Sequence, residues 1–251
     1  AEDGIRDLVR SRGLGDVYKR QEAGLINATK ISGRTHFGLG IGFFNAMTRE
    51  MSAIIKDTIT GESRHVKTEP FANFNILVLD QNLSNNSYIS LINTNVSRRS
   101  PKNDLYYTAN VTATDFMLKT KNNLYSVSAR IALSQKYYDT LDNEFGHSYN
   151  ISLGKTGGAF RAEYTLNGMS DTYDHNDMGY LRRNNEFENE LQFSYIINRP
   201  FWRINNTRNS IQFTYAQLYN PRVFTQSQIR ISSFTIFRNF SNINLMMEYT
   251  P

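Results

Sequence analysis

The sequence contains no cysteine and only five prolines among 251 residues, and it has no uninterrupted apolar stretch of about 20 residues. The absence of cysteine excludes disulfide frameworks, Cys-ligated zinc, iron–sulfur clusters and thiol nucleophiles. The absence of a long apolar run, with a mean hydropathy of −0.51, excludes a helical membrane protein. The net charge of +5 is small and scattered, so we expect no nucleic-acid partner.

Residues 1–21 have neither the apolar region of a signal peptide nor a clear relation to the rest of the chain. Residues 1–7 and 11–21 match in-frame translations of two sequencing-library adapters, in the right order, and residues 8–10 fit the sample index between them. The alternative is a natural basic amphipathic leader. We interpret residues 1–21 as a library artefact and expect residues 22–251 to be a fragment of a longer protein, truncated at both ends.

From Leu25 onward, β-branched and aromatic residues alternate with polar ones, and no segment shows a sustained helical period. Tyr125, Val127, Ala129, Ile131 and Leu133, for example, are separated by mostly polar residues. The pattern predicts an all-β chain with one apolar face throughout. The predicted strands lie near residues 25–32, 35–50, 69–83, 87–98, 106–119, 124–136, 148–155, 159–167, 189–197, 208–219, 227–238 and 243–250.

The connections between these strands alternate in length. The short ones are 33–34, 84–86, 120–123, 156–158, 198–207 and 239–242, and the long ones are 51–68, 99–105, 137–147, 168–188 and 220–226. Short turns at one end and long loops at the other are typical of outer-membrane barrels. We therefore predict an antiparallel up-and-down transmembrane β-barrel of about twelve strands, incomplete here. The alternative is a soluble β-rich carbohydrate-active enzyme or carbohydrate-binding module, in which the apolar face is an internal core.

The alternation assigns side chains to two environments. In the barrel interpretation, Phe160, Tyr164, Phe193 and Phe213 face lipid. The polar lumen is then lined by Arg130, Arg161, Glu163, Gln192, Gln212 and Arg230. The expected location is the outer membrane of a Gram-negative bacterium, and the expected partners are membrane lipid and lipopolysaccharide.

The longest polar loop offers a weak candidate for a calcium site in Asp171, Asp174 and Asp177. The spacing fits no defined calcium loop, so we favour a solvated acidic loop and predict no metal. Glu186, Glu188 and Glu190 alternate at a strand entrance, where paired carboxylates can serve glycoside hydrolysis. Charged residues on a wet strand face explain them more simply.

No catalytic motif is recognised elsewhere. The four histidines are dispersed and form no metalloprotease or triad signature, although convergence in space stays open. Gly38, Gly40 and Gly42 lie in an alternating strand with no helix after it, so they do not form a dinucleotide-binding loop. We interpret them as making room in a curved wall and expect neither a cofactor nor enzymatic activity.

Several segments carry a family resemblance in their order and spacing, namely residues 28–34, residues 40–48, Glu69-Pro70 with Asn73, residues 80–82 and residues 176–185. Together they resemble the bacterial family called domain of unknown function 5916. The resemblance covers nearly all of residues 23–240. It implies a C-terminal outer-membrane-type barrel, commonly preceded by a sandwich similar to family 9 carbohydrate-binding modules, and hence a glycan as a further expected partner. It brings no catalytic residues.

Overall fold

The computed structural model describes residues 24–56, 61–99 and 105–251. The segment 1–21 and parts of the connections 51–68 and 99–105 lie outside the described residues. The structure that is described is all-β, with fourteen strands. None of it forms a helix long and apolar enough to cross a membrane.

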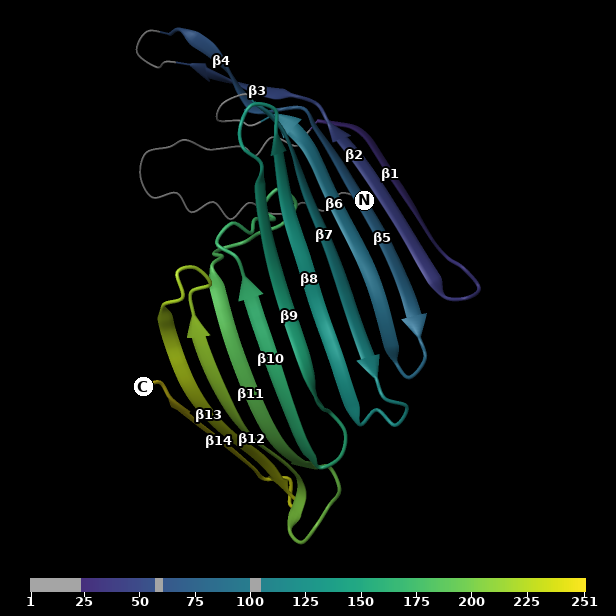
Figure 1. Cartoon of the computed structure of the whole chain (residues 1–251), viewed down its shortest axis with the longest axis vertical. Coiled ribbons are helices and arrows are strands. Elements are labelled where there is room, and N and C mark those ends of the chain that lie inside the picture. Colours follow the sequence, from purple (N-terminus) through teal and green to yellow (C-terminus); the bar gives the residue numbers. More distant parts are fainter. Residues whose placement is uncertain (1–23, 57–60, 100–104) are drawn as a thin grey trace.

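Twelve strands form one antiparallel sheet in which each strand pairs with its neighbours along the chain, and β3 and β4 form a separate hairpin inserted between β2 and β5 (Figure 1). The bounds are β1 Leu25–Arg34, β2 Leu39–Thr48, β3 Met51–Lys56, β4 Ser63–Glu69, β5 Ala72–Leu83, β6 Ser87–Arg99, β7 Tyr106–Lys119, β8 Tyr125–Tyr138, β9 Glu144–Lys155, β10 Phe160–Met169, β11 Glu186–Ile197, β12 Ile204–Gln217, β13 Phe224–Phe237 and β14 Asn242–Tyr249.

The prediction of about twelve strands in an antiparallel meander is confirmed, with shifted ends. The connection 51–68, expected to be a loop, contains the β3–β4 hairpin. The first turn lies beyond the predicted 33–34, because Arg34 still pairs with Gly40 and the chain reverses at 35–38, where Gly38 has a φ of 91°. β9 begins at Glu144 rather than at 148, because Glu144 pairs with Lys136 in the extended β8.

The sheet is curved, but it is not closed into a barrel. Within the described residues β1 pairs only with β2, and β14 pairs only with β13, so both edges are open. The connections that follow β2, β6, β8, β10 and β12 lie at one end of the sheet, and the other connections lie at the opposite end (Figure 1). We call these the long-loop end and the short-turn end. The predicted alternation of short and long connections holds only in part. Connections 49–71 and 170–185 are long, but 100–105, 139–143 and 218–223 are no longer than 198–203 at the opposite end.

The strands are staggered relative to the line of turns. The row of paired residues that starts at Arg34, beside the first short turn, passes through Asp80, Asp115 and Arg130. It continues through Asn150 and Glu188 and reaches Gln226 at the long-loop end of β13. The row therefore crosses the sheet diagonally. Such a stagger is the tilt that a sheet needs in order to close.

The sheet has very little core. The buried apolar side chains of the described residues are mostly alanines. The largest side chain that is fully buried among them is Val96. The sheet is a single layer, because the only other sheet in the described part of the chain is the two-stranded β3–β4 hairpin. Large apolar side chains are exposed along almost every strand, including Phe43, Leu91 and Leu133. No sandwich partner covers them among the described residues.

Candidate functional site

Polar side chains from successive strands gather on one face of the sheet, which we call the polar face. Directly paired residues of antiparallel strands project to the same side, and Glu163, Gln192, Gln212 and Arg230 form one continuous row of such pairs. Arg161 lies two residues before Glu163 on the same strand. Arg130 joins this face through the row Arg130, Asn150, Asn167 and Glu188. All six residues predicted to line a lumen therefore share one face.

Ion pairs cross between neighbouring strands on the polar face. Arg130 contacts Asp115 of β7, and Arg230 contacts Glu248 of β14 with a distance of 3.2 Å between Nη2 and Oε2. Arg34 of β1 contacts Asp80 of β5 across the intervening β2. The residue of β2 between them is Gly40, where an added Cβ would collide with the Asp80 carboxylate. Gly40 therefore leaves the space for this pair.

The connection between β10 and β11 folds onto the polar face and is held there by Asp177. Its Oδ1 accepts a hydrogen bond of 2.6 Å from Arg98 Nη2 and one of 2.7 Å from Tyr107 Oη, and its Oδ2 lies 3.4 Å from Lys136 Nζ. The side chain of Asp177 is only 8% exposed. The three partners come from β6, β7 and β8, so one carboxylate ties the loop to three strands.

The preceding residues of this loop are packed as well. Tyr173 is buried, and it lies against Gly146, where any Cβ would collide with the Tyr173 backbone. The N–H of Asp174 donates to Ser134 Oγ, and Lys136 Nζ donates to Asp174 Oδ2 at 2.6 Å. Burial of Asp174 opposes its ionisation, but hydrogen bonds from Lys136 and from the N–H of Asn176 outweigh this, so the pKa of Asp174 is lowered from its usual value.

The expectation of a solvated acidic loop was wrong for Asp174 and Asp177, whereas Asp171 is exposed. The carboxylates of Asp174 and Asp177 form ion pairs with Lys136 and Arg98, respectively. Asp171 accepts a hydrogen bond from Asn220 at 3.1 Å. The three weak calcium candidates therefore already have nitrogen partners. Across residues 24–56, 61–99 and 105–251, no group of three or more His, Asp or Glu side chains is placed to hold a metal ion.

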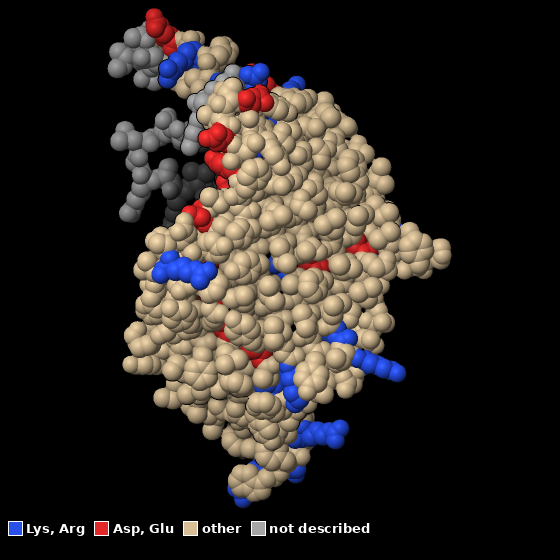
Figure 2. Space-filling model, in the orientation of Figure 1, with Lys and Arg blue, Asp and Glu red and all other residues tan. Residues whose placement is uncertain are grey.

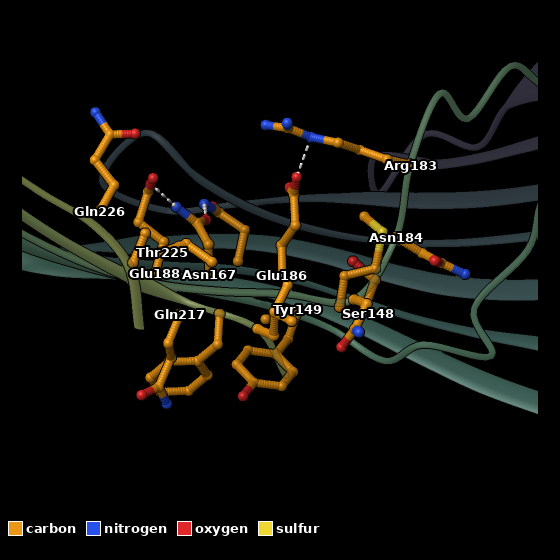
Figure 3. Close-up of a pocket in the computed structure, with 17 residues that line it drawn as sticks. Ser148, Tyr149, Asn167, Arg183, Asn184, Glu186, Glu188, Gln217, Thr225 and Gln226 are labelled. Atoms are coloured by element: carbon orange, nitrogen blue, oxygen red, sulfur yellow. Dashed lines mark hydrogen bonds and ion pairs between the residues drawn. The ribbon is translucent and has the colours of Figure 1, made fainter. Parts of the chain in front are cut away.

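A cavity of about 540 Å³ lies between this loop and strands β9 to β13 (Figure 3). Glu186 and Glu188 line it, together with Arg183, Asn184 and Gln226. Arg183 pairs with Glu186, and Asn167 Nδ2 donates to Glu188 Oε1 at 3.1 Å. The carboxylates are thus engaged by an arginine and an amide, with no histidine among the lining residues that the structure describes. Tyr149, Phe187 and Leu218 also line the cavity, so its wall is mixed in character.

The dispersed histidines do not converge on this cavity. His147 lies in β9 on the opposite face, where its Nε2 is 2.8 Å from the hydroxyl of Tyr219. His175 packs edge-on against Tyr173 in the loop. His36 lies in the first short turn and His65 in β4. The structure therefore places the four histidines in four separate environments.

The opposite face carries the apolar side chains, and we call it the apolar face. Phe193, Ile211 and Ile231 form one row of directly paired residues on it. Tyr164, Leu191, Phe213 and Ile229 form the next row. Phe160 and Phe213 are 50% and 38% exposed. Uncharged residues cover most of the molecule as seen in Figure 2.

One part of the apolar face is not apolar, which corrects the expectation of one apolar face throughout. Near the long-loop end of β2 and β5 to β8, amide and hydroxyl side chains project on this side. Asn45 Nδ2 donates to Asn73 Oδ1 at 2.7 Å, and Asn110 Nδ2 donates to Gln135 Oε1 at 2.9 Å. This amide surface comprises Asn45, Asn73, Asn75, Asn93, Asn110, Thr112 and Gln135.

A family model described as Domain of unknown function (DUF5916) matches residues 16–251. The chain belongs to this family. The match extends over the whole twelve-stranded sheet and begins inside the segment that we interpret as adapter-derived. No curated protein and no solved structure matches the chain. The packed segment 173–178 lies within the family's region and overlaps residues 176–185, which carry part of the resemblance.

Proposed function

We propose that this DUF5916 domain is an outer-membrane β-barrel wall, whose apolar face contacts lipid and whose polar face lines a hydrophilic interior. The observation that carries the proposal is the single-layer sheet with opposite faces of opposite character. On β10 to β13 one face holds Phe193 and Phe213, and the other holds Gln192 and Gln212. A soluble protein would have to cover the exposed apolar face, and lipid is the cover that fits its extent.

Three further features support a barrel. The stagger of the strands is the tilt that closure requires. The two longest connections, 49–71 and 170–185, lie at the same end of the sheet, as the external loops of outer-membrane barrels do. The loop held by Asp177 lies on the polar face, as a loop folded into a lumen would. To close the barrel, the open edges of β1 and β14 must pair with other strands. We propose that further strands of the barrel supply this pairing.

The interior we propose admits or holds a small hydrophilic solute, because its wall presents amides, hydroxyls and paired charges. The loop 170–185 narrows this interior at the long-loop end. The partners proposed for the outside are the lipids and lipopolysaccharide of a Gram-negative outer membrane. A glycan ligand for an upstream module stays a prediction that rests on the family resemblance, and the absence of enzymatic activity stays a prediction as well.

The test compares two adjacent residues of β11 that point to opposite faces. Arginine on the outer face of a barrel costs about 2–4 kcal/mol near the membrane midplane, whereas the lumen tolerates it at little cost. We expect Phe193→Arg to reduce assembly of the complete protein into membranes strongly, and Gln192→Arg to reduce it little. The assay is the fraction of protein that needs detergent for extraction and that migrates differently on gels when unheated.

A soluble sandwich would also be destabilised by Phe193→Arg, so the parent protein is measured beside the variants. We expect it to require detergent and to show heat-dependent migration, because a closed hydrogen-bond ladder resists detergent. A parent protein that is monodisperse in plain buffer would contradict the membrane proposal and favour the soluble carbohydrate-active alternative.

A further inference from the structure

Two arginines on the polar face differ from the other arginines of that face. Arg34, Arg98, Arg130 and Arg230 each contact a carboxylate. Arg161 of β10 and Arg208 of β12 contact none among the residues that the structure describes. A guanidinium stays charged at any ordinary pH. These two therefore present positive charge that the protein itself does not neutralise by contact.

Arg161 and Arg208 line the same cavity, of about 270 Å³, at the short-turn end of the polar face. Arg161 is oriented by its Nε, which donates to the backbone oxygen of Gly158 at 3.2 Å. This bond leaves its terminal Nη groups for another acceptor. Gln192, Ser194 and Thr156 add neutral hydrogen-bonding groups to the wall. Lys155 lines the cavity as well, and its Nζ donates to the backbone oxygen of Phe160 at 2.6 Å. The cavity thus combines three positive charges with several polar groups.

The charge around this cavity favours anions. The short turns carry Lys121, Arg199, Arg203 and Arg238 and contain no Asp or Glu. Figure 2 shows Lys and Arg protruding at the lower end of the molecule, where these turns lie. Charge of one sign around a concave polar surface raises the local concentration of ions of the opposite sign. The one acidic residue lining the cavity, among those described, is Glu163.

We propose that Arg161 and Arg208 form a binding site for an oxyanion, namely the carboxylate or phosphate group of a small hydrophilic solute. Guanidinium groups donate paired, charge-assisted hydrogen bonds to such groups. Ser194 and Gln192 supply further hydrogen-bonding groups from β11. Glu163 repels a second negative charge and so favours singly charged ligands. This assignment goes beyond the barrel proposal and depends only on the polar face.

The test is isothermal titration of the full chain in detergent, with inorganic phosphate and acetate as the two probes. We expect saturable binding of at least one probe, and the stronger probe identifies the source of the oxyanion. The double variant Arg161→Gln/Arg208→Gln should bind at least about tenfold more weakly, because two charge-assisted donors are lost. Glu163→Gln should bind more tightly, and added NaCl should weaken binding.

The matched control is Arg230→Gln, which removes a polar-face arginine that already pairs with Glu248. We expect it to retain the affinity of the parent. Unheated gel migration checks that each variant is folded. Equal binding by the parent and the double variant, or no saturable binding of either probe, would overturn the site. If the parent proves soluble in plain buffer, the barrel proposal fails while the same titration still decides the oxyanion site.

Discussion

Arg98 and Asp177 lie 79 positions apart in the sequence, yet Arg98 Nη2 is 2.6 Å from Asp177 Oδ1. This ion pair, together with Tyr107 and Lys136, holds the β10–β11 loop on the polar face.

We expect Asp177→Asn to loosen this loop. Removing one partner of a buried pair costs about 3–5 kcal/mol, and partial exposure of Arg98 reduces the expected loss to about 1–3 kcal/mol. Trypsin should then cleave faster after Arg182 and Arg183. The control is Asp171→Asn, the same exchange at an exposed carboxylate of this loop, which should cost at most about 1 kcal/mol. Equal cleavage rates in the two variants would show that Asp177 does not anchor the loop.

The attachment should also depend on pH through Asp174, whose pKa is lowered in the folded protein. A carboxyl group whose pKa is lower in the folded protein than in the unfolded chain stabilises the fold at pH values above the unfolded pKa of about 3.9. That stabilisation is lost as the pH falls through the lower folded value. We expect the near-ultraviolet circular dichroism of the buried Tyr173 to change over that acidic range. The Asp174→Asn variant should lack this step, and an identical step in both would exclude Asp174 as its origin.

The arrangement of strands was predictable because a half-buried strand imposes period two on its sequence, as in residues 125–133. The contact between Asp177 and Arg98 was not, because no local pattern encodes a contact between a loop and strands 79 positions away. The β3–β4 hairpin was missed because residues 51–56 and 63–69 are short and largely exposed, and so lack a clear apolar alternation.

The amide surface did leave a signal in the sequence. In β5, Asn73 and Asn75 occupy the positions that continue the row of Leu77 and Leu79, while Phe74 and Ile76 project to the other face. The apolar positions therefore change phase at the run 76–79. This continuous apolar run is the point at which the apolar residues of β5 pass from one face of the sheet to the other.

This exchange predicts where the hydrocarbon layer ends. Single cysteines at Asn75 and Leu79 lie on one strand and one face, in a background without cysteine. In reconstituted or intact membranes, an impermeant maleimide should label the Asn75→Cys variant and spare the Leu79→Cys variant. If neither variant is labelled, the prediction is wrong. The amide surface then lies within the lipid layer, where its hydrogen bonds satisfy the amides.

A side chain at Gly40 should break the pair between Arg34 and Asp80, because a Cβ there meets the Asp80 carboxylate and the Arg34 guanidinium. Both groups are exposed ends of flexible side chains that can move aside, so we expect Gly40→Ala to lower the free energy of unfolding by at most about 1 kcal/mol. Gly42→Ala is the matched control on the same strand, since its Cβ would meet Val78 Cβ at an ordinary 3.7 Å. The temperature at which gel migration changes measures both. Equal shifts would contradict the role given to Gly40.

The central claim is that the apolar face contacts lipid, and the most direct measurement uses tryptophan as a reporter of acyl chains. Phe213 and Gln212 are adjacent in β12 and project to opposite faces. Each is replaced by Trp in a Trp202→Phe background, which removes the only native tryptophan. In bilayers with brominated acyl chains, we predict strong quenching of the Phe213→Trp variant and little quenching of the Gln212→Trp variant. Equal quenching of both, or quenching of neither, would contradict the account.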